Sequence, residues 1–271
     1  MSGVVLITGA STGIGLATAQ LLAMVGYKVY AAVRDPSNAK ELQALSRKIT
    51  TLVMIKLDVT KSETIEAAVN EIYKIEKRID VLINNAGIGV YGPTESHSIY
   101  QVQAIFEVNV FGAIRMLHAV LPIMREQKSG LVINMSSISG VKPSANLPVY
   151  SASKAALQSL SDSDVADLIP HGIQVKSIQP GAVITEFEKS TPMGNHLLHP
   201  EQAYPNLQKN REDWNSLMRG GQSPFIVAEI IRQMITGERK EFWNPTSELV
   251  EKKIKAIYCS STGNPRIPAK L

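Results

Sequence analysis

Cysteine is almost absent from the sequence, with Cys259 as its single copy in 271 residues. One thiol closes no internal disulfide and supplies too little sulfur for a structural zinc site. Disulfide-stapled secreted domains and zinc-stapled domains are therefore excluded as classes. We expect no metal site and a chain that works in a reducing compartment, namely the cytoplasm.

Long apolar runs are also scarce. The most apolar window, residues 16–33, is interrupted by Gln20, Gly26 and Lys28, and it falls short of the roughly 20 residues that cross a bilayer. Apolar residues 4–7 follow the first methionine almost directly and run into a glycine turn, which is not the pattern of a secretion leader. We therefore expect neither a transmembrane segment nor a leader.

Charge is low and evenly spread. The chain has 28 Lys plus Arg against 24 Asp plus Glu, a net charge of +4, and no basic run exceeds two residues, as at Lys252-Lys253. Scattered charge leaves no basic patch for a nucleic acid, so we exclude that class of partner. A composition of 44% hydrophobic and 19% charged residues is typical of a globular chain.

Short β-branched runs alternate with longer segments of helical period along most of the chain. Strands are expected at 4–8, 28–33, 52–57, 80–84, 130–136 and 173–179, and helices at 13–25, 38–48, 61–77, 99–126, 148–169, 224–236 and 246–258. This order predicts an α/β fold with a mostly parallel sheet and helices on both faces. A further short apolar run lies near Phe242-Trp243.

The alternation stops at residues 182–223, and loops of such length are often lids. Its apolar residues suggest an apolar substrate: Met193, Leu197, Leu198, Tyr204, Trp214, Leu217 and Met218. We expect one catalytic domain over residues 1–245, including this lid, and a helical tail over 246–271. That tail is an amphipathic helix docked on its own domain or, as the alternative left open, a basic helix at a membrane surface.

Three glycines, Gly9, Gly13 and Gly15, lie where the first strand passes into the first helix. Glycines at such a turn let the backbone approach a pyrophosphate, and the helix N-terminus supplies free N–H groups. A nucleotide site is therefore predicted. The spacing Gly-x-x-x-Gly-x-Gly has no lysine for a P-loop.

This spacing is one of several motifs that together resemble the short-chain dehydrogenase/reductase family over residues 3–185. The others are Asn84-Asn85-Ala86-Gly87, Asn109, Ser137, Tyr150-x-x-x-Lys154 and Pro180-Gly181. Residues 29–35 and 114–122 look similar to its 17β-hydroxysteroid and retinol dehydrogenase branch. The resemblance implies a single-domain, doubly wound Rossmann fold with seven strands. It also implies a homodimer or homotetramer paired through the helix that carries Tyr150 and the helix before it.

The choice of nicotinamide cofactor depends on the end of the second predicted strand. The family position for an acid that binds a ribose 2′-hydroxyl aligns with the apolar Val33, and the basic Arg34 that follows is typical of NADP enzymes. Asp35 lies 20 residues after Gly15, about where such an acid is also expected. NADP(H) is thus preferred and NAD(H) stays open. The resemblance assigns the other cofactor contacts to Ser11, Thr12, Ile14, Asp58, Val59, Asn85, Ala86, Gly87, Tyr150, Lys154, Pro180, Gly181, Val183 and Thr185.

Two Tyr-x-x-x-Lys pairs occur, and their places in the predicted fold separate them. Tyr73 and Lys77 lie near the N-terminal edge of the sheet, whereas Tyr150 and Lys154 begin the helix after strand 130–136. Ligands of open α/β sheets bind at the C-terminal edge, so the second pair is the catalytic candidate. Ser137, 13 residues before Tyr150, matches the family's serine better than its neighbour in the chain.

The chemistry follows from the residue types. A ketone that accepts hydride needs a proton on its oxygen, which the phenol of Tyr150 supplies, and Lys154 is expected to lower the pKa of that phenol. Ser137 would stabilise the developing charge. By resemblance, Asn109 holds a water that relays protons to Lys154.

The predicted function is therefore an NADP(H)-dependent alcohol dehydrogenase or carbonyl reductase that acts on a hydrophobic, steroid-, retinoid- or lipid-like substrate. Two alternatives stay open. One is a regulatory protein that senses NADP without turnover, and the other is an epimerase or dehydratase of the same family.

Overall fold

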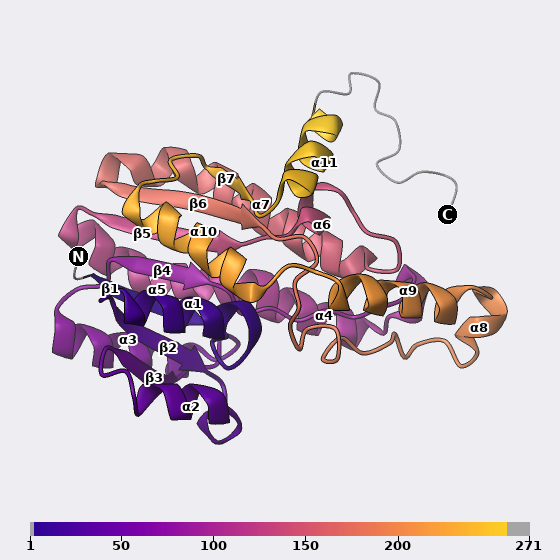
Figure 1. The fold of residues 1–271 in the computed structure, drawn as a ribbon, viewed down its shortest axis with the longest axis horizontal. Helices are drawn as coiled ribbons and strands as arrows, with labels where there is room; N and C mark the ends of the chain where they lie inside the picture. The colour runs from indigo at the N-terminus through magenta and orange to yellow at the C-terminus, as the bar shows by residue number, and fades with distance from the viewer. Residues whose placement is uncertain (1–2, 259–271) are drawn as a thin grey trace.

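Seven parallel strands form one sheet in the order β3-β2-β1-β4-β5-β6-β7 (Figure 1). The coordinates are a computed structural model, which describes residues 3–258. The strands are β1 (Val4–Thr8), β2 (Lys28–Val33), β3 (Leu52–Lys56), β4 (Val81–Asn84), β5 (Gly130–Met135), β6 (Ile173–Gln179) and β7 (Trp243–Pro245). Every predicted strand is present, with ends that differ by at most one residue. The predicted fold class is confirmed.

Two helical layers cover the sheet. One face carries α1 (Gly13–Met24), α2 (Lys40–Ser46) and α10 (Pro224–Thr236), and the other carries α3 (Ser62–Glu76), α5 (Gly112–Gln127) and α7 (Pro148–Leu168). Successive residues of β1 serve opposite layers, because Val5 and Ile7 belong to the first core and Val4 and Leu6 to the second. This two-sided burial explains why the strands are apolar at consecutive positions.

The chain crosses between the two halves of the sheet after β3, because β4 pairs with β1 on the side opposite β2. At such a reversal the loops after two neighbouring strands diverge and leave a crevice at the C-terminal edge. The glycine turn after β1 and the loop after β4 therefore lie side by side there.

The predicted helix 99–126 is continuous but irregular. It consists of α4 (Ile99–Phe106), the π-helical turn η3 (Glu107–Phe111) and α5. By length and apolar composition residues 99–127 could cross a membrane, and 44% of their most apolar window is buried inside the protein. A core helix packed on a sheet has the same length and composition.

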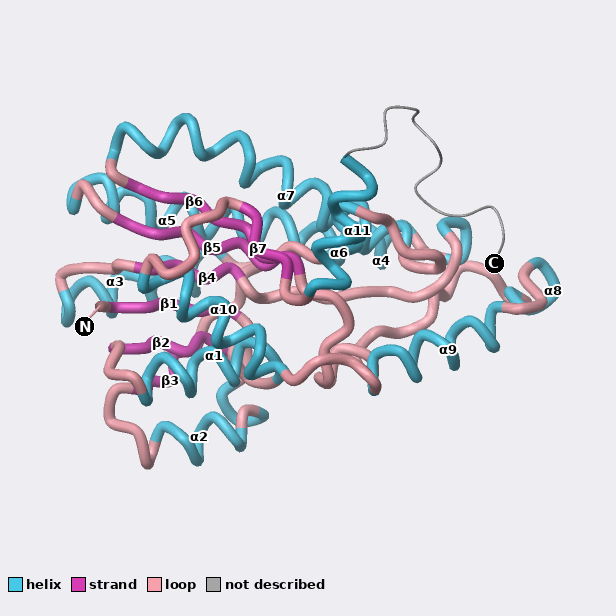
Figure 2. The backbone as a smooth tube through the Cα atoms, turned by 45° about the horizontal axis from the view of Figure 1, so that its top comes forward, coloured by secondary structure: helices cyan, strands magenta, loops and turns pink. Residues whose placement is uncertain are grey.

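The expectation of an irregular segment over residues 182–223 was wrong in part. It contains α8 (Pro200–Ala203) and α9 (Leu207–Arg219), which extend beyond the sheet on the side of the strand arrowheads (Figures 1 and 2). α9 is amphipathic, and of its residues only Leu207 is buried.

The remaining elements are short or lie near the C-terminus. They are the 3-10 turns η1 (Pro36–Asn38), η2 (Thr94–Ser96) and η4 (Ile169–His171), the turn α6 (Ile138–Val141) and the helix α11 (Glu248–Tyr258). Val250 and Ile254 of α11 pack against Val141, so the helix docks on its own domain. Cys259 and the rest of the predicted tail lie outside the described residues.

Candidate active site

A cleft of about 1190 Å³ lies at the C-terminal edge of the sheet. It brings together residues that are up to 244 positions apart in the chain, from Gly9 in the glycine turn to Lys253 of α11. The predicted site residues that line it are Gly9, Ser11, Thr12, Gly13, Ile14, Gly15, Arg34, Asp58, Val59, Asn85, Ala86, Gly87, Ser137, Tyr150, Lys154, Pro180, Gly181, Val183 and Thr185. Asn109 lies behind this surface.

The glycine turn has a backbone shape that requires glycine. Gly9 has φ +66° and Gly13 has φ +58°, both in the left-handed region. A Cβ at Gly9 would lie 2.8 Å from the Cα of Ala86, and one at Gly13 would lie 2.9 Å from the Thr185 side chain. The turn therefore packs tightly against the loops after β4 and β6, and any side chain at these positions would displace them.

Asn85 holds the glycine turn in place. Its side-chain nitrogen Nδ2 donates to the carbonyl oxygens of Thr8 at 2.8 Å and Gly9 at 3.0 Å. The Thr8 hydroxyl in turn accepts from the backbone N–H groups of Asn85 and Ala86, both at 3.1 Å. These contacts couple the ends of β1 and β4. Thr8 is a supporting residue that the sequence analysis missed, since it looks like an ordinary strand residue.

The start of α1 suits an anionic group. Its N-cap residue, Thr12, makes no side-chain capping hydrogen bond, and no acidic residue occupies the first turn. The free N–H groups and the positive end of the helix dipole thus face the cleft without a competing carboxylate. Together with the glycine turn, this arrangement fits the pyrophosphate of a dinucleotide.

The end of β2 presents a basic residue and no free acid to the cleft. Val33 and Arg34 line it, whereas Asp35 caps η1 and accepts hydrogen bonds from the backbone and hydroxyl of Ser37 and from Asn38. These hydrogen bonds hold the pKa of Asp35 below its usual range. Its carboxylate is therefore engaged locally, although the sequence spacing placed it near an expected ribose contact.

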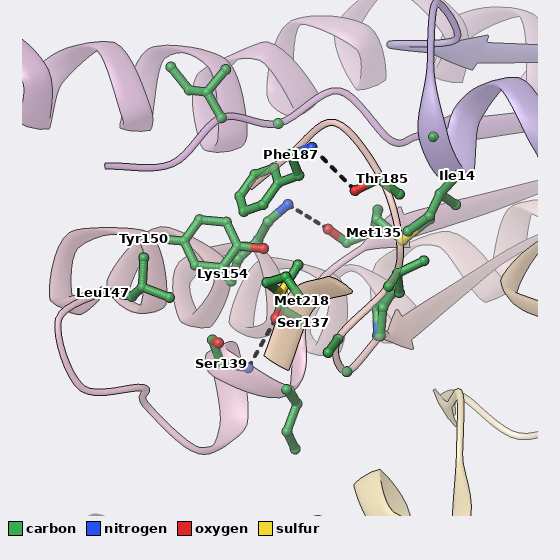
Figure 3. A pocket seen from close by; sticks show the side chains of 18 of the residues that line it. Ile14, Met135, Ser137, Ser139, Leu147, Tyr150, Lys154, Thr185, Phe187 and Met218 are labelled. Carbon is green, nitrogen blue, oxygen red and sulfur yellow. Dashed lines mark hydrogen bonds between the residues drawn. The ribbon is translucent and has the colours of Figure 1, made fainter. Parts of the chain in front are cut away.

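Ser137, Tyr150 and Lys154 meet at the ends of β5 and α7 (Figure 3). The Lys154 ammonium donates to the Met135 carbonyl oxygen at 2.7 Å and lies 5.9 Å from the centre of the Tyr150 ring. The Ser137 hydroxyl accepts from the Ser139 N–H at 3.1 Å. The neighbouring serine is turned away, because Ser136 donates to the Lys154 backbone oxygen.

Burial dominates the ionisation of this group. It raises the pKa of Tyr150 to about 12, opposed by the hydrogen bond with Ser137, and it lowers the pKa of Lys154 to about 8. The pKa of Tyr150 is therefore shifted in the direction opposite to the one expected from Lys154, because removing the phenolate from water is the largest effect. Tyr150 is accordingly a protonated phenol at neutral pH, ready to donate.

Asn109 sits in the π-helical turn η3 and is fully buried. Its side-chain nitrogen donates to the Ile88 carbonyl oxygen and the Ser153 hydroxyl, both at 3.0 Å, and its oxygen accepts from the Ile88 N–H at 2.8 Å. A Cβ at Gly87 would lie 3.3 Å from both the Asn109 oxygen and the Lys154 nitrogen. Asn109 thus braces the loop after β4 beside Lys154.

An apolar wall surrounds the Tyr150 hydroxyl. The Phe187 ring packs at 5.4 Å from the Tyr150 ring, and Leu147 and Met218 lie nearby (Figure 3). Of the apolar residues expected in a lid, Trp214, Leu217 and Met218 line the cleft. Met193, Leu197, Leu198 and Tyr204 do not; Leu198 is 92% exposed, and Met193 and Tyr204 pack around Tyr91 and Leu207 instead.

The sequence analysis missed two residues of this wall and one residue behind it. Tyr91 and Phe187 line the cleft from the loops after β4 and β6, and Arg211 lies on α9 without lining the cleft. For Tyr91 and Phe187 the available signal was their position soon after predicted strand ends. Their contacts depend on loop paths that no periodicity encodes.

The reversal of strand order, the glycine turn against α1 and the Ser-Tyr-Lys group at the C-terminal edge define a doubly wound Rossmann-type protein of the dehydrogenase class. A sequence model of the family described as short chain dehydrogenase matches residues 3–195, and the chain belongs to this family of oxidoreductases.

Known proteins support this assignment over most of the chain. Retinol dehydrogenase 8 of Bos taurus is 38% identical over 87% of this chain and 78% of its own length. The 3-ketodihydrosphingosine reductase of Bacteroides thetaiotaomicron is 40% identical over 92% of this chain and 89% of its own length. Estradiol 17-beta-dehydrogenase 1 of Rattus norvegicus is 42% identical over 71% of this chain and 58% of its own length. The predicted likeness to this branch is confirmed.

A solved structure agrees with the fold. A short-chain dehydrogenase from Streptomyces avermitilis superimposes with a TM-score of 0.82 at 30% identity, covering 94% of this chain and 92% of its own.

Proposed function

We propose that the chain is an NADP(H)-dependent oxidoreductase that transfers hydride between the nicotinamide and a hydrophobic secondary alcohol, ketone or aldehyde. The observation that carries the proposal is the meeting of Ser137, Tyr150 and Lys154 in the same cleft as the glycine turn. Relatives named for retinol, estradiol and 3-ketodihydrosphingosine support an apolar substrate.

The site residues divide the work of carbonyl reduction. The nicotinamide supplies the hydride when bound. Ser137 donates a hydrogen bond to the carbonyl oxygen, and Tyr150 transfers its hydroxyl proton to that oxygen as negative charge develops there. Lys154 stands beside the tyrosinate so formed and stabilises it by its positive charge. Asn109 braces the adjoining loop. We also assign to Asn109 the binding of a water molecule that relays protons to Lys154.

The cofactor preference rests on the end of β2. Arg34 lines the cleft, and among residues 3–258 no hydrogen bond or ion pair holds its guanidinium. It is therefore available to bind a 2′-phosphate with charge-assisted hydrogen bonds. Asp35 is engaged in its cap and does not compete for a ribose hydroxyl. We assign the pyrophosphate to the glycine turn, the adenine to Asp58 and Val59, the adjoining ribose to Asn85, Ala86 and Gly87, and the nicotinamide to Pro180, Gly181, Val183 and Thr185.

We extend the proposal to the organisation of the chain. Residues 1–245 are assigned to the catalytic domain, 182–223 to a substrate lid in which α9 lines the cleft, and 246–271 to a tail. We propose a homodimer or homotetramer that works in the cytoplasm. Chromatographic mass measurement in solution and fractionation of cells test these two points.

The enzymatic proposal is tested by mixing the protein with NADPH and a panel of steroid, retinoid and aliphatic carbonyls while nicotinamide absorbance is followed. We expect Tyr150→Phe to lose about 10²–10⁴-fold in turnover because the proton donor is gone, with NADPH binding retained. Tyr73→Phe is the matched control. Its hydroxyl hydrogen-bonds to Glu126 at 3.2 Å on the surface, so activity should not change.

Two outcomes contradict the proposal. Thermal stabilisation by NADPH without turnover of any carbonyl would favour the sensing alternative. Near-full turnover by Tyr150→Phe would reject the assigned proton donor.

A further inference from the structure

Arg211 of α9 packs against two aromatic rings that contact each other, behind the surface of the cleft. Its guanidinium carbon is 4.8 Å from the centre of the Tyr91 ring and 4.7 Å from that of Trp214, and the two rings are 5.4 Å apart. Both rings line the cleft, whereas Arg211 does not. A planar cation in contact with two aromatic rings attracts both of them.

The same side chain reaches the segment that carries Phe187. Its nitrogen Nη2 donates to the carbonyl oxygens of Glu188 at 3.1 Å and Thr191 at 2.8 Å. The Thr191 hydroxyl donates to the Phe187 carbonyl oxygen at 2.7 Å, and the Phe187 ring packs on Tyr150. Arg211 is therefore connected through two short steps to the ring that flanks the candidate proton donor.

Burial of the Arg211 guanidinium has an energetic cost, because one of its nitrogen atoms is unsatisfied. Its Nη1 atom is buried without a hydrogen-bond partner among the described residues. An arginine whose surroundings leave one nitrogen unsatisfied adds less stability than a well-packed apolar side chain of similar volume would. Against this cost, the positive, planar group makes contacts with the two rings and hydrogen bonds to the two carbonyl oxygens, which an apolar side chain could not make.

Resting on the proposed function, we infer that Arg211 is a positioning residue that assembles Tyr91, Trp214 and residues 187–191 into the apolar wall of the substrate site. It sets the affinity for apolar carbonyl substrates through these groups without contacting the substrate. The three parts of the wall come from the loop after β4, the loop after β6 and α9, and Arg211 contacts all three.

The test compares Arg211→Met, which keeps the bulk, with Arg211→Lys, which keeps the charge but loses the planar fork. Arg219→Met is the matched control, because Arg219 lies on the same helix, is 64% exposed and pairs with the Glu188 carboxylate at 2.9 Å. For a steroid or retinoid ketone we expect KM about tenfold higher in Arg211→Met, with kcat within about threefold and NADPH affinity unchanged. Arg211→Lys should show most of this rise.

A second readout follows the wall itself. Trp214 and Trp243 are the two tryptophans of the chain, so Trp243→Phe, introduced into every protein compared, leaves Trp214 as the reporter. Loss of the stack should shift its emission to longer wavelength and make acrylamide quench it more strongly in Arg211→Met than in Arg219→Met.

The inference is overturned if Arg211→Met matches Arg219→Met in both KM and Trp214 quenching. If Arg211→Met does not fold, as judged by the absence of thermal stabilisation by NADPH, Arg211→Lys decides, and an unchanged KM and quenching in that variant reject the inference. If the wild type turns over no carbonyl, the proposed function fails by itself, and Trp214 quenching still decides the role of Arg211.

Discussion

Replacing Lys154 by methionine should make the protein more stable while it abolishes turnover. Burial lowers the pKa of Lys154 from 10.5 to about 8. That difference corresponds to about 3 kcal/mol of penalty on the charged form at neutral pH. Methionine has a similar length and no charge to desolvate. It also loses the hydrogen bond to the Met135 carbonyl oxygen, worth about 1 kcal/mol, so the net gain is about 2 kcal/mol.

The gain should depend on pH in a defined direction. Between pH 8 and about 10.5 the unfolded wild type holds the Lys154 proton and the folded wild type has released it, so wild-type stability rises with pH across this window. Lys154→Met lacks this titration. Its advantage should therefore be largest at pH 7 and close to zero at about pH 9.5.

Thermal and urea unfolding of both proteins at the two pH values measure the effect. We expect Tm to rise by about 4 °C at pH 7 in Lys154→Met. Exposed Lys74, changed to methionine, is the control and should leave Tm and its pH dependence unaltered. A Lys154→Met protein less stable than the wild type at pH 7, or a gap that is equal at both pH values, would refute the reasoning.

Three further outcomes are expected. Arg34→Ala should weaken NADPH binding about tenfold and leave NADH binding nearly unchanged in calorimetric titrations, because the 2′-phosphate loses its charged partner; equal losses for both cofactors would count against this role. Gly9→Ala should lose cofactor-induced thermal stabilisation and about 1–3 kcal/mol of stability, because φ +66° and the close Ala86 backbone leave no room for a Cβ; a wild-type Tm with and without NADPH would contradict it. The rate of carbonyl reduction should fall as pH rises through about 8, where Lys154 loses its charge, while Tyr150, with a pKa of about 12, keeps its proton; a flat profile from pH 6 to 10 would contradict it.

How far the site can be predicted from sequence depends on how local each feature is. The glycine turn is predictable because a strand, three glycines and a helix follow one another within 20 residues. Tyr150 is distinguishable from Tyr73 because a helix that follows a strand begins at the sheet's C-terminal edge, whereas one that precedes a strand ends at the other edge. Asp35 shows the limit. Its spacing suits a ribose contact, yet its carboxylate is occupied by Ser37 and Asn38 only two and three residues away.

The pKa of Tyr150 shows a different limit. The sequence predicts its neighbour Lys154 by helical spacing, and a nearby positive charge should favour the phenolate. Burial by residues from other loops has the opposite and larger effect, and the amount of burial is a property of the folded cleft. The lid is similar, because α9 is held by contacts with a loop about 20 to 30 positions earlier in the chain, which its own amphipathic pattern does not reveal.

The sequence by itself determined the parallel α/β fold, the nucleotide turn and the chemical identity of the Ser137, Tyr150 and Lys154 group. These are encoded in periodicity and spacing over a few residues, where apolar alternation, glycine conformation and helical geometry act locally. The tertiary structure alone decided the direction of the tyrosine pKa and the contacts of Arg211 with Tyr91, Glu188 and Thr191. Those properties arise from exclusion of water and from contacts between positions as many as 120 apart in the chain, and neither leaves a local pattern.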